Sequence, residues 1–358
     1  MTEHGFYQDS HFIVKYENND FRIYETCLLE ECNREQASHA YLRVTKSGMT
    51  TLQATQTIAS QLQVPLADVA YAGRKDEEGV SEQYMTVPLD AIAAVGDKAL
   101  VASAHEHAEA WMNAVLIGFT AKSLDIGELA ANTFKIVLRR VQKDMASILC
   151  SKRQHSLFYI NYYDTQRFGM PDRPKLTHQV GNYLAQEKWQ EAFDTVLRSG
   201  TEEARHAQEW KGNAAGFFAS LEPRSRDFFL AARESSGWNN KVSELVLSVC
   251  GDECIQHRYE DLHFVYPVSS HAVTKVATEC QELSFNRYDS RSGTTRKYAI
   301  ERPTVSQVPI RIEGQQEDEH FSGYTAVTLS FTLPQGGYAT MVLRQLELQL
   351  SAELKQQE

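Results

Sequence analysis

One carboxylate, Asp76, stands in a context that could present a nucleophile. It follows a short apolar run at 69–71 and the segment Ala-Gly-Arg-Lys at 72–75, and Glu-Glu-Gly comes after it. The neighbouring cations favour the ionised form of the carboxyl group, and a strand end lets the side chain project from a rigid base. A carboxylate held in this way can act as a nucleophile. Charged surface turns use the same residue types, so the residues alone leave both interpretations open.

Length and composition are typical of a soluble globular protein with room for two domains. Of the 358 residues, 42% are hydrophobic and 23% are charged. No apolar run approaches the roughly 20 residues that a membrane helix needs, and the polar N-terminus lacks the core of a signal peptide. We therefore expect a cytoplasmic protein that does not bind membranes, and we expect a monomer.

The net charge of -11 counts against a nucleic-acid partner, because RNA affinity rests largely on neutralising phosphates. The charges are grouped, however. Basic residues gather at Arg139, Arg140, Lys143, Lys152 and Arg153, and again at Arg287, Arg291, Arg296 and Lys297. Acidic residues gather at Glu313, Glu317, Asp318 and Glu319. The pattern allows a basic cleft on an acidic protein, and it equally allows solvated charged faces.

The six cysteines are spread through the chain, which is typical of reduced thiols and not of a disulfide framework. Cys250, Cys254 and His257 come closest to metal-ligand spacing. A second ligand pair at zinc-finger spacing is missing, and Cys250 ends an apolar helical pattern, so core packing is the favoured interpretation. We expect no metal and no cofactor.

Local patterns predict an α+β fold. Short β-branched or aromatic runs predict strands over 12–16, 40–44, 82–87, 114–119, 133–139, 309–312 and 326–331, with a further short strand leading into Asp76. Apolar residues at helical spacing predict helices over 52–62 (with Thr51 as N-cap), 89–95, 104–111, 143–155 and 341–354, and a mainly helical stretch over 175–250. Strands at both ends of a helical middle predict one catalytic domain interrupted by an insertion.

Four separated stretches together resemble the TruD family of tRNA pseudouridine synthases. They are 72–76 with 81–83, 132–134 with Leu138-Arg139, 161–169, and 333–340 with Leu343-Arg344. The family patterns are A-G-x-K-D, G-N-x-F, N-Y-F-G-x-Q-R-F-G and L-P-x-G-S-Y-A-T, and Phe12-Ile13-Val14 is similar to a first-strand pattern, D-F-x-V-x-E. The resemblance implies a catalytic domain with a mixed, largely antiparallel sheet over 1–160 and 304–358, and a mainly helical α+β insertion over 161–303.

The resemblance also implies an activity: isomerisation of uridine to pseudouridine in RNA, at position 13 of tRNA, without a cofactor. Asp76 takes the place of the catalytic nucleophile. The expected substrate-binding residues are Phe12, Asn132, Phe134, Tyr338, Lys75 and Gln83. Phe134 would stack on the target uracil, whereas alternation along its strand, taken alone, favours a core residue.

The chemistry suits these residue types. An aromatic ring can hold the flat face of uracil while an amide such as that of Asn132 reads its polar edge. A uridine in structured RNA must first be turned out of its stack. A carboxylate can then attack the sugar or assist deprotonation while the base changes its bond from N1 to C5, and the sequence leaves both routes open.

Several residues depart from the family patterns, and the changes at Glu77 and Phe6 lower the local positive charge. Glu77 replaces an arginine, Gly79 and Ser81 replace alanine and threonine, Ala131 replaces a glycine, and Phe6 lies near the place of a lysine. Two other interpretations therefore stay open: a non-catalytic RNA-binding or RNA-folding factor on the same scaffold, and an acidic α+β domain without a nucleic-acid role.

Overall fold

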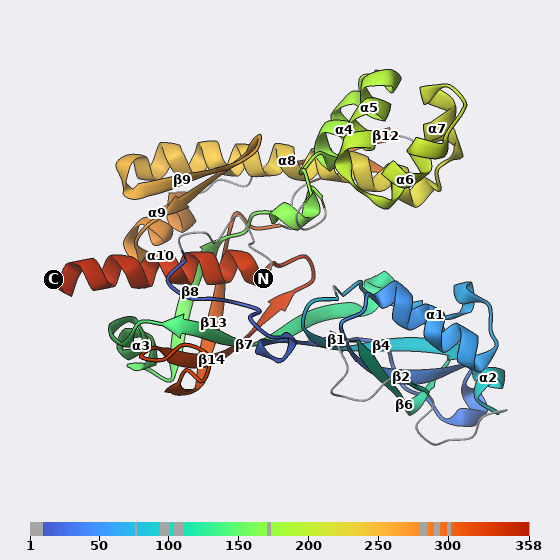
Figure 1. The fold of residues 1–358 in the computed structure, drawn as a ribbon, viewed down its shortest axis with the longest axis horizontal. Helices are drawn as coiled ribbons and strands as arrows, with labels where there is room; N and C mark the ends of the chain where they lie inside the picture. The colour runs from blue at the N-terminus through green and yellow to red at the C-terminus, as the bar shows by residue number, and fades with distance from the viewer. Residues whose placement is uncertain are drawn as a thin grey trace. The chain divides into compact units, whose positions relative to one another are not determined.

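The structure is a computed structural model that describes residues 10–75, 77–93, 101–103, 110–169, 173–279, 285–289, 294–298 and 302–357. The chain forms two compact units (Figure 1). We call His11–Ser156 with Val308–Gly337 the sheet unit, and Leu157–Gln307 with the residues from 338 onward the helical unit. The insertion over 161–303 stays a prediction, because compactness does not show which segment was inserted.

The sheet unit is built on one large mixed sheet. Its path runs β5-β6-β2-β4-β1-β7-β14-β13 and ends at β8, and β3 pairs with β4 off this path. The strands are β1 (Phe21–Cys27), β2 (His39–Ser47), β3 (Ala70–Tyr71), β4 (Val80–Pro88), β5 (Val101–Ser103), β6 (Trp111–Thr120), β7 (Leu129–Val141), β8 (Gln154–Ile160), β13 (Val305–Glu317) and β14 (Thr325–Pro334). β1 and β4 are parallel, whereas β1 with β7, β14 with β7 and β2 with β4 are antiparallel. The expected mixed, largely antiparallel sheet is confirmed.

Among its described residues, the sheet unit has the helices α1 (Thr51–Leu62), α2 (Leu89–Ala93) and α3 (Lys143–Cys150). α1 begins in a capping box, in which Thr50 Oγ1 accepts from Gln53 N at 3.2 Å and Gln53 Oε1 accepts from Thr50 N at 2.7 Å. Its buried face, including Ile58 and Leu62, packs on Leu42 of β2 and on residues of β4 and β6. Figure 1 shows α1 lying along these strands. Each fully buried aliphatic side chain contributes about 1.5–3 kcal/mol, so this face fixes α1 on the sheet.

The helical unit confirms the helical pattern predicted over 175–250. Its helices are α4 (Thr177–Leu184), α5 (Trp189–Ser199), α6 (Glu202–Glu209), α7 (Ala214–Ser220), α8 (Pro223–Cys250), α9 (Ser270–Glu279) and α10 (Ala339–Gln357). Val180, Val196, Phe217 and Phe229 form the centre of its core. A Cβ atom at Gly181 would lie 2.1 Å from the Phe229 carbonyl oxygen, so only glycine allows α4 and α8 to approach this closely.

Short hairpins and 3₁₀ turns complete the described residues. The hairpins are β9 (Cys254–Tyr259) with β10 (Leu262–Pro267), and β11 (Phe285–Asp289) with β12 (Thr294–Tyr298). The 3₁₀ turns are Asn18–Asp20, Arg34–Gln36, Leu66–Asp68, Ile126–Glu128, Thr165–Arg167 and Gly251–Glu253. No described helix is long and apolar enough to cross a membrane.

Some predicted elements are wrong. The strand over 12–16 is reduced to one bridge between Ile13 and Arg139, because Lys15 adopts a φ of 58°, which ends an extended run. The real first strand, β1, begins at Phe21 and was not predicted. The helix that begins at Lys143 ends at Cys150 and not at residue 155, because residues from Gln154 join the sheet as β8. The N-cap of α1 is Thr50 and not Thr51.

Other predictions fall partly outside the described residues. The helix over 89–95 is present as α2 as far as Ala93. Of the helix over 104–111, residues 104–109 lie outside the described residues, and Trp111 begins β6. Cys280 also lies outside the described residues, and the other five cysteines are free thiols.

Candidate active site

Asp76 lies outside the described residues, but the backbone on both sides of it is held by the connection from β2 to α1. Lys75 N donates to Thr51 Oγ1 at 2.7 Å, and the Lys75 carbonyl accepts from Lys46 Nζ at 3.3 Å. Beyond position 76, the Glu77 carbonyl accepts from Gly48 N at 3.0 Å. Lys46 and Thr51 are themselves buried. The residues that flank Asp76 are therefore held by a buried base, and the catalytic role of Asp76 stays a prediction.

Lys75 forms a buried ion pair with Glu25 of β1. The second carboxylate oxygen, Glu25 Oε2, accepts from Tyr84 N at 3.1 Å. A buried pair of this kind is tolerated only when the remaining polar atoms are also satisfied. Burial, together with the charge of Glu25, raises the pKa of the neighbouring Cys27 thiol to about 12, so this thiol keeps its proton near neutral pH. Substrate binding by Lys75 stays a prediction, with its ammonium group paired to Glu25.

Unpaired polar atoms gather on one face of the sheet. Gln83 Oε1 accepts from Thr51 Oγ1 at 3.0 Å, which orients the amide. Its Nε2 is buried and, among the described residues, has no hydrogen-bond partner, and the same is true of Ser81 Oγ and Asn132 Oδ1. The strand registers place Ser81 beside Ile23 and Asn132 beside Glu25, so these side chains share a face.

These atoms could read a base. A buried polar group without a partner costs about 1–3 kcal/mol, and such groups are found where a ligand completes the hydrogen bonds. The donor of Gln83 and the acceptor of Asn132 match the C=O and N–H groups on the edge of a pyrimidine. The residues predicted at positions 83 and 132 thus lie on strands β4 and β7, which both border β1.

An aromatic row lies on the same face. The Phe134 ring stacks on Phe331, with centroids 5.4 Å apart, and meets the edge of Phe21 at 5.9 Å. Phe134 is only 7% exposed. Lys15 Nζ lies 4.8 Å from the centre of the Phe21 ring and 3.3 Å from Glu78 Oε2. Phe134 therefore has the burial that strand alternation predicts, and its stacking on uracil stays a prediction.

Phe12, predicted to contact the nucleotide, is buried and lies outside any strand. The segment Asp20-Phe21-Arg22-Ile23-Tyr24-Glu25 reproduces the first-strand pattern D-F-x-V-x-E, with isoleucine in place of valine, and coincides with β1. The assignment of the first strand to Phe12 is therefore wrong. The sequence itself contains this better match to the first-strand pattern. In it, Phe21 and not Phe12 stands at the phenylalanine of the pattern.

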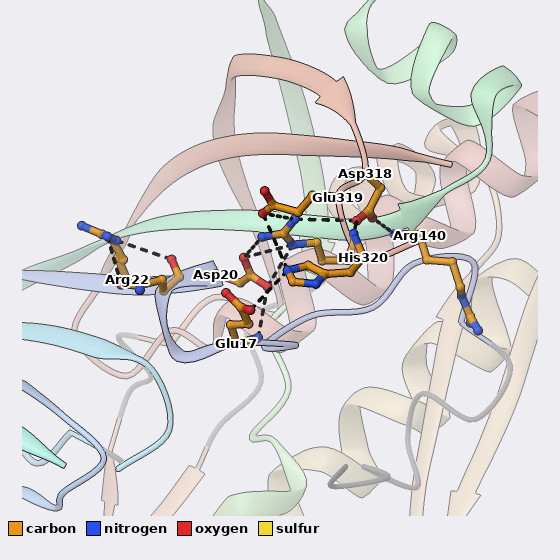
Figure 2. Close-up of polar contacts among 9 residues, drawn as sticks. Glu17, Asp20, Arg22, Arg140, Asp318, Glu319 and His320 are labelled. Carbon is orange, nitrogen blue, oxygen red and sulfur yellow. Dashed lines mark hydrogen bonds and ion pairs between the residues drawn. The ribbon is translucent and has the colours of Figure 1, made fainter. Parts of the chain in front are cut away.

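A cluster of charged residues holds the start of β1 (Figure 2). Arg139 Nη2 donates to Asp20 Oδ1 at 2.7 Å, and its Nη1 donates to Glu319 at 3.0 Å. Asp318 accepts from Arg140 N at 2.7 Å. Burial opposes ionisation of Asp318, but hydrogen bonds from backbone N–H groups and the Arg139 charge outweigh it and hold its pKa below the ordinary value. Part of the basic group in the sequence thus pairs with part of the acidic group and anchors the sheet.

Tyr338, in the helical unit, belongs to a separate cluster. Its ring lies 6.2 Å from that of Tyr163, and the Arg302 guanidinium lies 4.1 Å from Tyr163 and 5.9 Å from Tyr338. Arg302 also donates to the carbonyl of Asn161 at 3.1 Å. Burial raises the pKa of Tyr338 to about 12, against the opposing charges of Arg167 and Arg302, so the phenol keeps its proton.

The thiols with metal-ligand spacing do not converge. Cys250 Sγ contacts the Ala272 carbonyl at 3.6 Å, Cys254 Sγ contacts Gly251, and His257 contacts Arg344. Within the part of the chain that the structure describes, no group of three or more His, Cys, Asp or Glu side chains could hold a metal ion.

A family model for tRNA pseudouridine synthase D (TruD) matches residues 9–215, which is more than half of the chain. The chain belongs to the TruD family. The tRNA pseudouridine synthase D of an Anaeromyxobacter strain is 29% identical over 88% of this chain and 87% of that protein. The enzyme of the same name from Aquifex aeolicus is 27% identical over 52% of this chain, and the match spans 46% of that protein.

A solved structure shows the TruD fold. The crystal structure of TruD from Methanosarcina mazei matches with a TM-score of 0.55 and 18% identity, over 95% of this chain and 94% of that chain. The family patterns at 72–76, 132–134 and 161–169 all lie within the residues that the TruD model matches.

Proposed function

We propose that this chain isomerises uridine to pseudouridine in tRNA, at position 13, with Asp76 as the nucleophile. Membership of the TruD family supports the reaction class. The observation that carries the assignment of Asp76 is the pair of backbone anchors around it, Thr51 with Lys46 on one side and Gly48 on the other. A nucleophile needs such a fixed base, whereas a charged surface turn does not.

The sheet face beside these anchors supplies groups for the target nucleotide. Gln83 and Asn132 pair with the edge of the uracil, and Phe134 and Phe21 hold its face. Phe21 replaces Phe12 in this role because it lies on β1 next to Phe134. Tyr338 is a further proposed contact of the substrate nucleotide, in keeping with its place in the pattern at 333–340.

The reaction itself exchanges one bond at C1′ for another and moves one proton. The N1–C1′ bond breaks, the base rotates, a C5–C1′ bond forms, and the proton on C5 moves to N1, so the product has the same atoms as the substrate. No oxidant or reductant takes part, and no cofactor is required. We further propose that the enzyme acts as a monomer in the cytoplasm.

The test compares Asp76→Asn with Glu77→Gln, which removes the adjacent carboxylate. Each variant and the wild type are incubated with tRNA from cells that lack this enzyme, and pseudouridine is mapped by sequencing. We expect product at position 13 with wild type and Glu77→Gln, and none with Asp76→Asn. Equal product from wild type and Asp76→Asn would contradict the role of Asp76. RNA binding without any product from the wild type would favour the non-catalytic binding factor.

A further inference from the structure

An exposed aromatic residue and an arginine lie together in the helical unit, outside the residues assigned above. Phe228, on α8, is 41% exposed. The guanidinium of Arg167 lies 5.1 Å from the centre of its ring. Arg167 Nε donates to Ser235 Oγ at 3.3 Å, two helical turns further along α8. The arginine is thus held on the helix by one weak hydrogen bond and by the ring.

Arg167 keeps hydrogen-bonding capacity. Its Nε is the guanidinium atom used on Ser235, and among the described residues Arg167 forms no ion pair within 4.0 Å with a carboxylate. The nearby carboxylate of Asp164 is engaged elsewhere, by Thr165 N at 2.6 Å and Thr340 Oγ1 at 2.7 Å. The end of the guanidinium that carries Nη1 and Nη2 suits a phosphate, which accepts two parallel hydrogen bonds.

The same segment connects this pair to Tyr338. Tyr163 and Arg167 both belong to the stretch 161–169, and the charge of Arg167 acts on Tyr338. Tyr163, Arg302 and Tyr338 form one group of rings and guanidinium, and Arg167 with Phe228 forms a second group. Alternating rings and cations are typical of proteins that bind single-stranded nucleic acid.

We propose that Arg167 and Phe228 form a subsite for the RNA nucleotide next to the one that Tyr338 contacts. Arg167 binds its phosphate, and its base stacks on the exposed face of Phe228. The inference rests on the proposed function, because turning a uridine out of its stack leaves its neighbours without a stacking partner. The exposed ring replaces that partner.

A plain alternative is that Phe228 is one of the scattered apolar residues found on most protein surfaces. The helical unit itself offers two matched controls. Trp189 on α5 is also an exposed aromatic residue, at 38%, and Arg198 on α5 is an exposed arginine that contacts Thr195. Truncation of either control removes a ring or a charge without touching the proposed subsite.

The experiment measures the Kd of the full-length protein for unmodified tRNA over a range of salt concentrations. Phe228→Ala should weaken binding by about 5- to 150-fold, the effect of losing one stacked base. Arg167→Met should reduce the slope of log K against log[salt] by about 0.7, the effect of losing one phosphate contact on a single strand. Trp189→Ala and Arg198→Met should bind as the wild type does.

An RNA with an abasic position beside the target, placed on the 5′ or the 3′ side in turn, sharpens the test. On the side whose base stacks on Phe228, removal of the base should weaken the wild type, and Phe228→Ala should then cause no further loss. Binding of Phe228→Ala equal to that of the wild type, in an enzyme that forms pseudouridine, would overturn the subsite. A wild type that forms no pseudouridine would instead overturn the proposed function, so the two failures are distinct.

Discussion

At the scale of single residues, Glu25 is a charged side chain on the inward face of β1. Its ion pair with Lys75 explains how the interior accommodates this charge. The carboxylate shares its two oxygens between Lys75 and the Tyr84 N–H. Burying the two charges costs desolvation free energy, and their mutual attraction offsets this cost only while both charges are present. The pair therefore contributes more to the placement of the segment before Asp76 than to net stability.

Glu25→Gln should lower the free energy of unfolding by about 3–5 kcal/mol, because it leaves the Lys75 ammonium buried without a counter-charge. Glu25→Gln combined with Lys75→Met should recover most of this loss, because neither charge remains. Urea unfolding at neutral pH measures both. Arg43→Gln, which breaks the half-exposed pair with Glu82, is the control and should cost less than about 1 kcal/mol. Additive losses in the double variant would show that the two side chains do not act as a pair.

The residues of the candidate site could be predicted only in part. Gln83 and Phe134 lie on strands that regular alternation predicts, and Asn132 lies on the same strand as Phe134, whereas their contacts with a nucleotide stay predictions. The run that begins at Phe12 is more apolar than the run that begins at Phe21, so apolar patterning favours the wrong phenylalanine. The Glu25–Lys75 pair joins residues 50 positions apart, and no local pattern in the sequence connects them.

At the scale of elements, the charged cluster in Figure 2 fixes where β1 begins. Asp20 accepts a hydrogen bond from Arg139, near the end of β7, and Asp318, in the turn after β13, accepts one from the backbone N–H of Arg140. Arg140 has a φ of 56°, so the end of β7 leaves the regular extended conformation where these carboxylates gather. The cluster therefore joins the ends of three elements that are distant in sequence.

The depressed pKa of Asp318 predicts loss of stability in acid. Its folded pKa lies below the unfolded value of about 3.9, so the contribution is complete above that value and is lost as pH falls through the folded value. Asp318→Asn should destabilise the protein at pH 7, and the gap from the wild type should close below a pH of about 4. Denaturant unfolding at several pH values measures the gap, with the exposed Glu317→Gln as control. A gap independent of pH would contradict this account.

Long periodic elements such as α1, β7 and α10 could be predicted from the sequence, because each repeats its apolar spacing over many residues. β1 could not be predicted in this way, because Arg22 and Glu25 interrupt its apolar pattern. The partner of the inward Glu25 carboxylate is Lys75, which is distant in the sequence. The β9–β10 hairpin was also missed. Its turn contains Glu260 with a φ of 53°, where glycine or asparagine is the usual signal.

At the scale of the whole molecule, net charge is a poor guide to the partner. Some acidic residues that contribute to the net charge of -11 form ion pairs with arginine or lysine inside the sheet unit, as Asp20 and Glu25 do. RNA responds to the local potential of the surface it approaches, and that potential depends on arginines such as Arg167. The amino-acid composition counts buried, paired charges and surface charges alike, so the net charge does not distinguish them.

The two ends of the predicted insertion meet within the helical unit, and the insertion itself stays a prediction. Asn161 N donates to the Thr304 carbonyl at 2.8 Å, and Asn161 Nδ2 donates to the Pro303 carbonyl at 3.2 Å. The two ends of the segment 161–303 therefore lie side by side, as an inserted domain requires.

Each unit has its own buried core, one around Leu42 and one around Phe217. Because chains with separate cores often unfold in more than one step, we expect two thermal transitions. Leu42→Ala should lower the transition of the sheet unit by about 2–5 kcal/mol, and Phe217→Ala that of the helical unit by about 3–5 kcal/mol. Scanning calorimetry identifies the transitions, and the double variant should show both shifts independently, since distant sites are additive. A single transition that both substitutions lower together would instead show that the two units unfold as one.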